Sequence, residues 1–301
     1  RKIEFDWSEH KDKKEFLKPQ PKILVIVGGT ATGKSELAIK LALKLGGEVI
    51  SADSRQVYKG LDVGTGKISQ KDMRGIPHYL IDIVSPKKKF TVVDFKKLAD
   101  KKIKEIIKKG KLPIICGGTG FYIDAVTKGV VLPEVPPNNK LRKELEGKTT
   151  EELVLTLQKF DTTRAQNIDT KNRVRLIRAI EIAKALGKVP AIVEEKPEYK
   201  FIKIGLMLPE ELFQKKVKTR VRGMFKAGLL KEIETLKKSG VSEKRLEEFG
   251  FEYNNPTEES VIKETLRYAK RQMTWFKRDK EIYWLNTSKD VVSKVSERLN
   301  L

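Results

Sequence analysis

From residue 22 onward, short apolar runs alternate with amphipathic stretches. Buried strands are predicted by the apolar runs at 22–27, 48–51, 78–84 and 112–116. Between them, the helical spacing of apolar residues predicts helices at 35–45 and 91–109. Strands and helices that alternate in this order form a parallel sheet flanked by helices, so we expect an α/β fold.

A Pro-rich linker at 132–140 interrupts this alternation. Beyond the linker only helical patterns recur until the apolar run at 201–208, after which helices and a last apolar run at 281–285 follow. We therefore expect three parts of the chain: an α/β core formed by 22–133 and 197–301, an all-helical insertion at 134–196, and an unassigned N-terminal extension at 1–21.

A phosphate-binding loop follows the first predicted strand. The segment GGTATGKS, from Gly28 to Ser35, satisfies the pattern G-x-x-x-x-G-K-[ST] between a strand and a helix. Its glycines let backbone amides point at phosphate oxygens, beside the positive end of the helix. Lys34 adds a charge and Ser35 a hydroxyl that suits Mg²⁺. The fold is therefore expected to be P-loop NTPase-like.

The acid that a nucleotide-hydrolysing P-loop protein needs beside Mg²⁺ is missing from the expected place. Asp82 lies inside an apolar run, which disfavours a motor or a switch. Asp53 follows the second strand and reaches the same edge of the sheet as the phosphate loop. Its carboxylate suits Mg²⁺ binding or proton transfer, and an Asx turn is the alternative.

A second Gly-rich loop, CGGTG at 116–120, follows the strand at 112–116. Because parallel strands end at one edge of the sheet, this loop and its Thr119 are expected beside Asp53. A simple tight turn is the alternative interpretation. For Cys116 we expect a buried structural thiol.

The net charge indicates a polyanionic partner. Lys and Arg number 63 against 41 Asp and Glu, which gives a formal charge of +22. The single cysteine excludes a disulfide framework, which favours a cytoplasmic location. The longest apolar runs fall far short of the roughly 20 residues that cross a bilayer, so no membrane partner is expected.

Basic residues gather along one side of the predicted helix at 261–278. Helical spacing separates a core seam of Ile262, Leu266, Ala269, Met273 and Phe276 from a basic stripe. The stripe consists of Arg267, Lys270, Arg271, Thr274, Lys277 and Arg278. It contains few acids for a solvated face, so it favours contact with a nucleic-acid backbone.

Basic residues also crowd the start of a predicted helix in the insertion, whose Val174, Ile177, Ala179 and Ile182 are expected to face inward. Near a helix N-terminus these charges oppose the dipole, so an external anion is a reasonable partner. In the resumed core, Arg220 and Arg222 are both candidates to close over a diphosphate.

These motifs resemble those of the tRNA dimethylallyltransferases. The resemblance covers residues 22 to about 285, and its most specific segments are DSRQVYKGLDVGTGK at 53–67 and KRQMTWF at 270–276. Further segments are GGTGFYIDA at 117–125 and NRVRLIRAIE at 172–181. A C-terminal zinc finger of the eukaryotic members is excluded by the single cysteine, so the resemblance implies a bacterial type.

The resemblance implies transfer of a dimethylallyl group from dimethylallyl diphosphate to the exocyclic N6 amine of the adenosine just 3′ of the anticodon in tRNA. The P-loop then holds the donor's diphosphate, and Mg²⁺ is the implied cofactor. The tRNA anticodon arm is the implied partner of the insertion at 134–196, and a monomer is expected. The alternatives are a P-loop small-molecule kinase and a non-enzymatic RNA-binding P-loop protein.

The resemblance also assigns roles to individual residues. Catalytic roles fall on Asp53, Thr30, Lys34 and Arg220. Diphosphate contacts fall on Gly28, Gly29, Thr30, Ala31, Thr32, Gly33, Lys34, Ser35 and Arg220. Contacts with tRNA fall on Asp53, Ser54, Arg55, Gln56, Thr119, Arg142, Arg175, Arg178, Gly250, Phe251, Lys270, Arg271, Gln272, Thr274, Trp275 and Lys277. Mg²⁺ is expected at Ser35 and Asp53.

Overall fold

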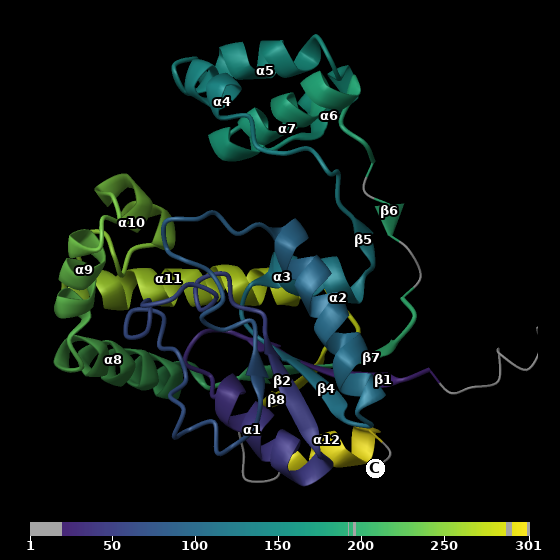
Figure 1. Cartoon of the computed structure of the whole chain (residues 1–301), viewed down its shortest axis with the longest axis vertical. Coiled ribbons are helices and arrows are strands. Elements are labelled where there is room, and N and C mark those ends of the chain that lie inside the picture. The colour runs from purple at the N-terminus through teal and green to yellow at the C-terminus, as the bar shows by residue number, and fades with distance from the viewer. Residues whose placement is uncertain (1–19, 192, 195–196, 287–290, 300–301) are drawn as a thin grey trace, which may run out of the picture. The chain divides into compact units, whose positions relative to one another are not determined.

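The computed structural model describes residues 20–191, 193–194, 197–286 and 291–299. The predicted extension at 1–21 therefore lies almost entirely outside the described residues. The chain forms two compact units (Figure 1): the first combines 1–127 with 196–301, and the second is Lys128–Glu195. None of the described helices has both the length and the apolar run that a bilayer crossing requires.

A parallel sheet forms the centre of the first unit, as predicted. Its strands are β1 (Lys22–Gly28), β2 (Gly47–Ser51), β3 (His78–Tyr79), β4 (Leu112–Cys116), β7 (Lys200–Met207) and β8 (Tyr283–Asn286). In the order β3-β2-β4-β1-β7-β8, β1 lies between β4 and β7. The loops that follow β1, β2 and β4 therefore leave the same edge of the sheet, at the carboxyl ends of the strands.

Helices cover both faces of this sheet (Figure 1). They include α1 (Lys34–Leu45), α2 (Val92–Lys108), α3 (Gly120–Thr127) and α12 (Val291–Leu299). Alternate residues of β1 point to opposite layers: Ile23 and Val25 pack with α2 and α3, whereas Leu24 and Ile26 pack with α1 and α12. Because β1 is buried on both faces, its sequence is continuously apolar rather than alternating.

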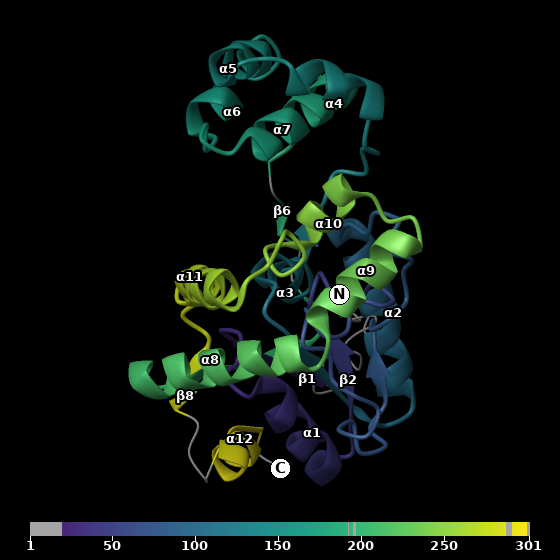
Figure 2. The same ribbon diagram turned by 90° about the vertical axis from the view of Figure 1, so that its left-hand side faces the viewer.

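A group of helices follows β7 in the first unit. It comprises α8 (Glu210–Lys226), α9 (Leu229–Lys238), α10 (Glu243–Phe249) and α11 (Glu258–Phe276). The helices α8 and α11 are neighbours (Figure 2), and Val217 and Val221 of α8 pack against Val261 of α11. A further apolar cluster joins α9 to Leu61 in the loop after β2. These contacts place α8, α9 and α11 around the edge of the sheet at which the P-loop lies.

The second unit has a core of its own, which includes Leu153 and Leu176. Its elements are β5 (Val130–Val131), α4 (Asn139–Glu146), α5 (Thr150–Gln158), α6 (Thr162–Asn167), α7 (Arg173–Leu186) and β6 (Val193–Glu194). The predicted insertion is helical over α4–α7, but its two connecting segments also pair as the short antiparallel strands β5 and β6, which were not predicted. The same pairing places 128–133 in this unit rather than in the core.

Two further local predictions were wrong. The expected strand at 78–84 ends at Tyr79, since Leu80 and Asp82 both adopt a left-handed backbone that breaks the extended chain. On α7, Val174 does not face inward but is 78% exposed, whereas Ala179 and Ile182 are buried as predicted, together with Leu176 and Ile180. The prediction for this helix was therefore wrong at Val174, in its first turn.

Candidate active site

The P-loop forms the turn between β1 and α1. Gly28 has a φ of 144°, and a Cβ atom there would lie 2.5 Å from the carbonyl oxygen of Leu206 on β7. Gly33 has a φ of 92° and is the N-cap of α1. Both glycines therefore satisfy backbone requirements that a side chain would disturb. The buried hydroxyl of Thr32 donates to the carbonyl oxygen of Gly29 at 2.8 Å, which closes the turn.

Lys34 lies inside the loop that it follows. Its Nζ donates to the carbonyl oxygen of Gly29 at 2.6 Å. Burial is the main cause that lowers the pKa of Lys34 to about 8, and the charge of Arg220 lowers it further, against the attraction of Asp53. An anion bound in the loop would stabilise the charged form of this lysine and raise its pKa again.

A main cavity of about 540 Å³ opens beside the P-loop. Residues of the P-loop, the loops after β2 and β4, α8, α11 and the loop between α10 and α11 line it, together with residues of α1, β2 and β3. Of the predicted site residues, it is lined by Thr30, Ala31, Gly33, Lys34, Ser35, Asp53, Arg55, Gln56, Arg220, Phe251 and Gln272. The structure therefore brings together the predicted catalytic residues Thr30, Lys34, Asp53 and Arg220.

Asp53 adopts the turn that we considered as its alternative role. Its Oδ1 accepts hydrogen bonds from the backbone amides of Arg55 at 2.9 Å and Gln56 at 3.3 Å. These bonds fix the carboxylate at the wall of the main cavity. A rigidly held carboxylate suits a general base, so the Asx turn and a catalytic role are compatible.

Arg220 of α8 reaches the main cavity, whereas Arg222 is exposed and does not line it. Nη2 of Arg220 donates to the carbonyl oxygen of Thr65 at 3.1 Å. Burial is the main cause that lowers the pKa of Arg220, and the charge of Arg55 adds to it. A bound anion would stabilise the positive charge of a guanidinium that is so poorly solvated.

The loop after β4 packs against the loop after β2. The backbone amide of Ser54 donates to Oγ1 of Thr119 at 3.0 Å, and the amide of Thr119 donates to the carbonyl oxygen of Ala52 at 3.2 Å. A Cβ atom on Gly117 would lie 2.2 Å from that same oxygen. The glycine therefore permits close approach of the two loops. Cys116 is buried as predicted, and burial raises the pKa of its thiol to about 11.

Arg55 is held by groups that are distant in the sequence. Its guanidinium forms an ion pair with the buried Glu252 and lies 5.4 Å from the ring centroid of Tyr268 and 5.9 Å from that of Phe251. A Cβ atom on Gly250 would lie 3.0 Å from Nη1 of this arginine. Gly250 and Phe251 thus contact Arg55 within the protein.

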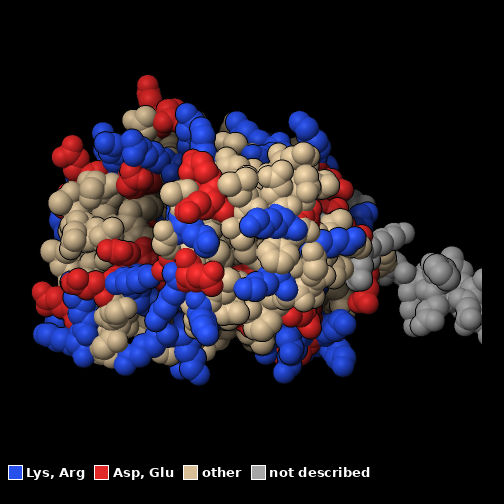
Figure 3. Space-filling model, turned by 90° about the horizontal axis from the view of Figure 1, so that it is seen from above, with Lys and Arg blue, Asp and Glu red and all other residues tan. Residues whose placement is uncertain are grey.

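The basic stripe of α11 lines a second surface depression. Its lining residues are Arg267, Lys270, Arg271, Thr274, Trp275 and Arg278. Trp275 is half-buried, and its Nε1 donates to Oδ2 of Asp124 at 3.1 Å. Lys277 is exposed and is the C-cap of α11. Basic and acidic side chains are interspersed on the face that Figure 3 shows, so net charge alone does not locate a binding surface.

In the second unit, two of the three predicted tRNA-contacting arginines have a partner within the unit. Arg142 and Arg178 both form ion pairs with Glu181, whose side chain is fully buried. Arg178 also donates to the carbonyl oxygen of Val135 at 2.7 Å. Arg175 is exposed. These contacts give Arg142 and Arg178 a structural role beside any contact with RNA.

The oxygen donors for a metal ion are few. Among the described residues, no group of three or more His, Cys, Asp or Glu side chains is arranged to hold a metal. Ser35 and Asp53 both line the main cavity. Mg²⁺ commonly uses one or two protein oxygens together with water and substrate phosphates, so this sparse donor set fits a metal that arrives with a diphosphate.

Several residues in or near the main cavity were not singled out by the sequence. Thr65, Glu252 and Tyr268 line the main cavity, and Glu232 contacts the loop that carries Thr65. Thr65 lies in the segment DVGTGK, which the resemblance includes without a role. The others carry no local signal, because distant packing brings them to the site.

Comparison with known proteins identifies the family. The family model described as IPP transferase matches residues 56–279. The tRNA dimethylallyltransferase of Acetivibrio thermocellus is 39% identical over 285 residues, which are 88% of this chain and 91% of that protein. The enzyme of the same name from Anoxybacillus flavithermus is 38% identical over 286 residues, which are 90% of this chain and 92% of that protein.

Comparison with solved structures points to the same family. The tRNA isopentenylpyrophosphate transferase of Staphylococcus epidermidis is 34% identical, with a TM-score of 0.67, and covers 93% of this chain and 99% of that chain. A eukaryotic dimethylallyltransferase that acts on tRNA has a TM-score of 0.74 at 26% identity, with coverage of 92% of this chain and 77% of that chain. This chain therefore belongs to the IPP transferase family.

Proposed function

We propose that this chain is a tRNA dimethylallyltransferase that uses dimethylallyl diphosphate to prenylate the N6 amine of the adenosine 3′-adjacent to the anticodon. One observation carries the proposal: a single cavity brings the P-loop, Arg220 and Asp53 together. Among the described residues, β4 beside β1 ends at Cys116 rather than at an acid, which distinguishes the site from a nucleotide-hydrolysing one.

In the proposed reaction the N6 nitrogen attacks C1 of the dimethylallyl group. The bond from C1 to the diphosphate oxygen breaks, diphosphate leaves, and the nitrogen loses a proton to Asp53. An aromatic amine is a weak nucleophile, so stabilisation of the leaving group and positioning supply most of the rate enhancement. The loop amides, Lys34 and Arg220 stabilise the negative charge that develops on the diphosphate.

Mg²⁺, when bound with the donor, would be held by Ser35 and Asp53 and would neutralise charge on the leaving diphosphate. The acceptor base cannot react while it is stacked in its loop, so it must be flipped into the cavity at a cost of a few kcal/mol. Basic residues of the second depression, such as Arg271, would offset that cost by binding phosphates of the anticodon arm.

The test is incubation with unmodified tRNA, Mg²⁺ and labelled dimethylallyl diphosphate, followed by mapping of the labelled nucleotide. Label on the adenosine 3′ of the anticodon is the expected result. Failure to label any RNA, together with ATP-dependent phosphorylation of a metabolite, would instead identify a small-molecule kinase.

A further inference from the structure

The carbonyl oxygen of Thr65 holds two side chains of the main cavity. It accepts hydrogen bonds from Nη2 of Arg220 at 3.1 Å and from Nε2 of Gln56 at 3.5 Å. The neighbouring Gly66 lies so close to the guanidinium that a Cβ atom there would be 2.1 Å from Nη2. The position of this loop segment therefore decides where the guanidinium of Arg220 points.

One carboxylate anchors the residues that precede this carbonyl group. Oε2 of Glu232, on α9, accepts from the backbone amides of Asp62 at 2.8 Å and Val63 at 2.7 Å. Its Oε1 accepts from the amide of Gly64 at 3.1 Å and from the hydroxyl of Tyr253 at 2.9 Å. Hydrogen bonds to an ionised acceptor are stronger than neutral ones. Four donors thus converge on one side chain.

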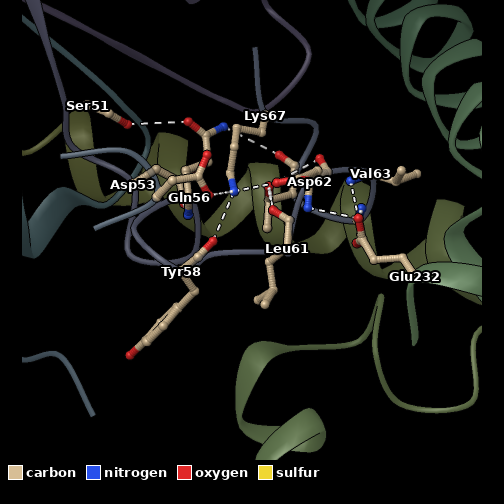
Figure 4. Close-up of polar contacts among 12 residues, drawn as sticks. Ser51, Asp53, Gln56, Tyr58, Leu61, Asp62, Val63, Lys67 and Glu232 are labelled. Carbon is tan, nitrogen blue, oxygen red and sulfur yellow. Dashed lines mark hydrogen bonds and ion pairs between the residues drawn. The ribbon is translucent and has the colours of Figure 1, made fainter. Parts of the chain in front are cut away.

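Lys67 holds the other end of the same segment (Figure 4). Its Nζ donates to the carbonyl oxygen of Tyr58 at 2.9 Å and forms ion pairs with Asp62 and Asp82. The Lys67 side chain is only 5% exposed. Asp62 is therefore fixed twice, by Glu232 through its amide and by Lys67 through its carboxylate.

We propose that Glu232 is a positioning residue for the donor's diphosphate: it fixes residues 62–64, these place the carbonyl group of Thr65, and that group aims Arg220 into the main cavity. Glu232 is missing from the described residues that line the cavity, so it acts through Arg220 and not by contact with substrate. This inference rests on the function proposed above.

The test measures binding of inorganic diphosphate with Mg²⁺ by calorimetry. In Glu232→Gln one amide oxygen must replace two carboxylate oxygens, which leaves at least one backbone N–H group facing the amide NH₂. We expect affinity for diphosphate to fall roughly tenfold. In an Arg220→Lys background, which keeps the charge but not the guanidinium, the same change should cost less than about twofold, because the two residues act in one chain of contacts.

Glu234→Gln is the matched control, since Glu234 is exposed on the same helix. It should bind diphosphate as the unsubstituted chain does. An equal loss of affinity in both backgrounds would overturn the inference, as would a lower unfolding temperature of Glu232→Gln with unchanged affinity. If the unsubstituted chain itself fails to bind diphosphate, the proposed function is overturned together with this inference.

Discussion

Gln272 accepts a hydrogen bond from the backbone amide of Thr30 at 2.9 Å, across 242 positions of the chain. The same side chain donates from its Nε2 to the carbonyl oxygen of Gly118 at 2.9 Å and is only 7% exposed. It therefore joins α11 to the P-loop and to the loop after β4. A contact of Gln272 with tRNA stays a prediction, and the structure adds this bridging role.

Replacement of the bridging side chain should destabilise the fold. Gln272→Leu leaves the amide of Thr30 and the carbonyl group of Gly118 without these partners, which should lower the free energy of unfolding by about 1–3 kcal/mol. Urea unfolding measures the change. The control Lys263→Leu, at an exposed position of α11, should stay within about 0.5 kcal/mol of the unsubstituted chain. Equal stability of the two variants would contradict the bridging role.

Asp53→Asn tests the role of Asp53 as a general base while it keeps the turn at this position. Asparagine keeps an oxygen that can accept from the amides of Arg55 and Gln56, but it is not a base. Single-turnover prenyl transfer should slow by about 10²- to 10⁴-fold, while affinity for tRNA changes little. A variant that transfers the dimethylallyl group at the original rate would remove the assignment of Asp53 as the base.

The lowered pKa of Lys34 makes diphosphate binding depend on pH. Above pH 8 the free protein loses this charge, so affinity for diphosphate should fall as the pH rises, and binding should take up a proton. Calorimetry in buffers of different ionisation enthalpy measures the uptake. Lys34→Arg stays charged throughout and should lack this part of the uptake; an identical uptake in both proteins would disprove the prediction.

The lowered pKa of Lys34 also makes the free energy of unfolding depend on pH. Because the pKa of Lys34 in the folded chain, about 8, lies below its ordinary value of 10.5, the unfolded chain binds more protons between these pH values. Below about pH 8, burial of the charged Lys34 therefore destabilises the fold to its full extent. This destabilisation decreases as the pH rises from about 8 to 10.5. Urea unfolding of the unsubstituted chain and of Lys34→Met across that range measures the effect: the stability of the unsubstituted chain relative to Lys34→Met should rise with pH, because other titrating groups contribute to both proteins.

Arg271→Ala tests the basic depression. If Arg271 contacts an RNA phosphate, its loss should weaken tRNA binding and reduce the slope of log affinity against log salt concentration by about 1. Lys101→Ala, at an exposed position of α2, is the control and should leave the slope unchanged. Equal slopes for Arg271→Ala and the unsubstituted chain would make the stripe an ordinary solvated face.

The P-loop was recognisable from the sequence because its requirements are local. Gly33 needs a left-handed backbone where the loop enters α1, and Lys34 follows it directly. The order of strands and helices was also predicted, since the spacing of apolar residues reflects burial within each element. The meeting of Asp53 with the P-loop followed from the common edge of a parallel sheet.

Contacts between distant segments were decided by the tertiary structure. The predicted seam of α11 contained Ala269 and Phe276, yet the buried face also includes Gln272, whose polarity hid its burial from a search for apolar periodicity. Likewise, charge and helical position left both Arg220 and Arg222 as candidates, and only the resemblance favoured Arg220; in the structure, packing turns Arg220 into the main cavity.

The sequence by itself thus determined the phosphate loop, the α/β order and, through its motifs, the family. The tertiary structure alone decided which polar groups meet, as Glu232 and the amides after Leu61 do. The physical reason is that turn chemistry and periodicity act over a few residues, whereas a hydrogen bond between α9 and the loop after β2 depends on how whole elements pack.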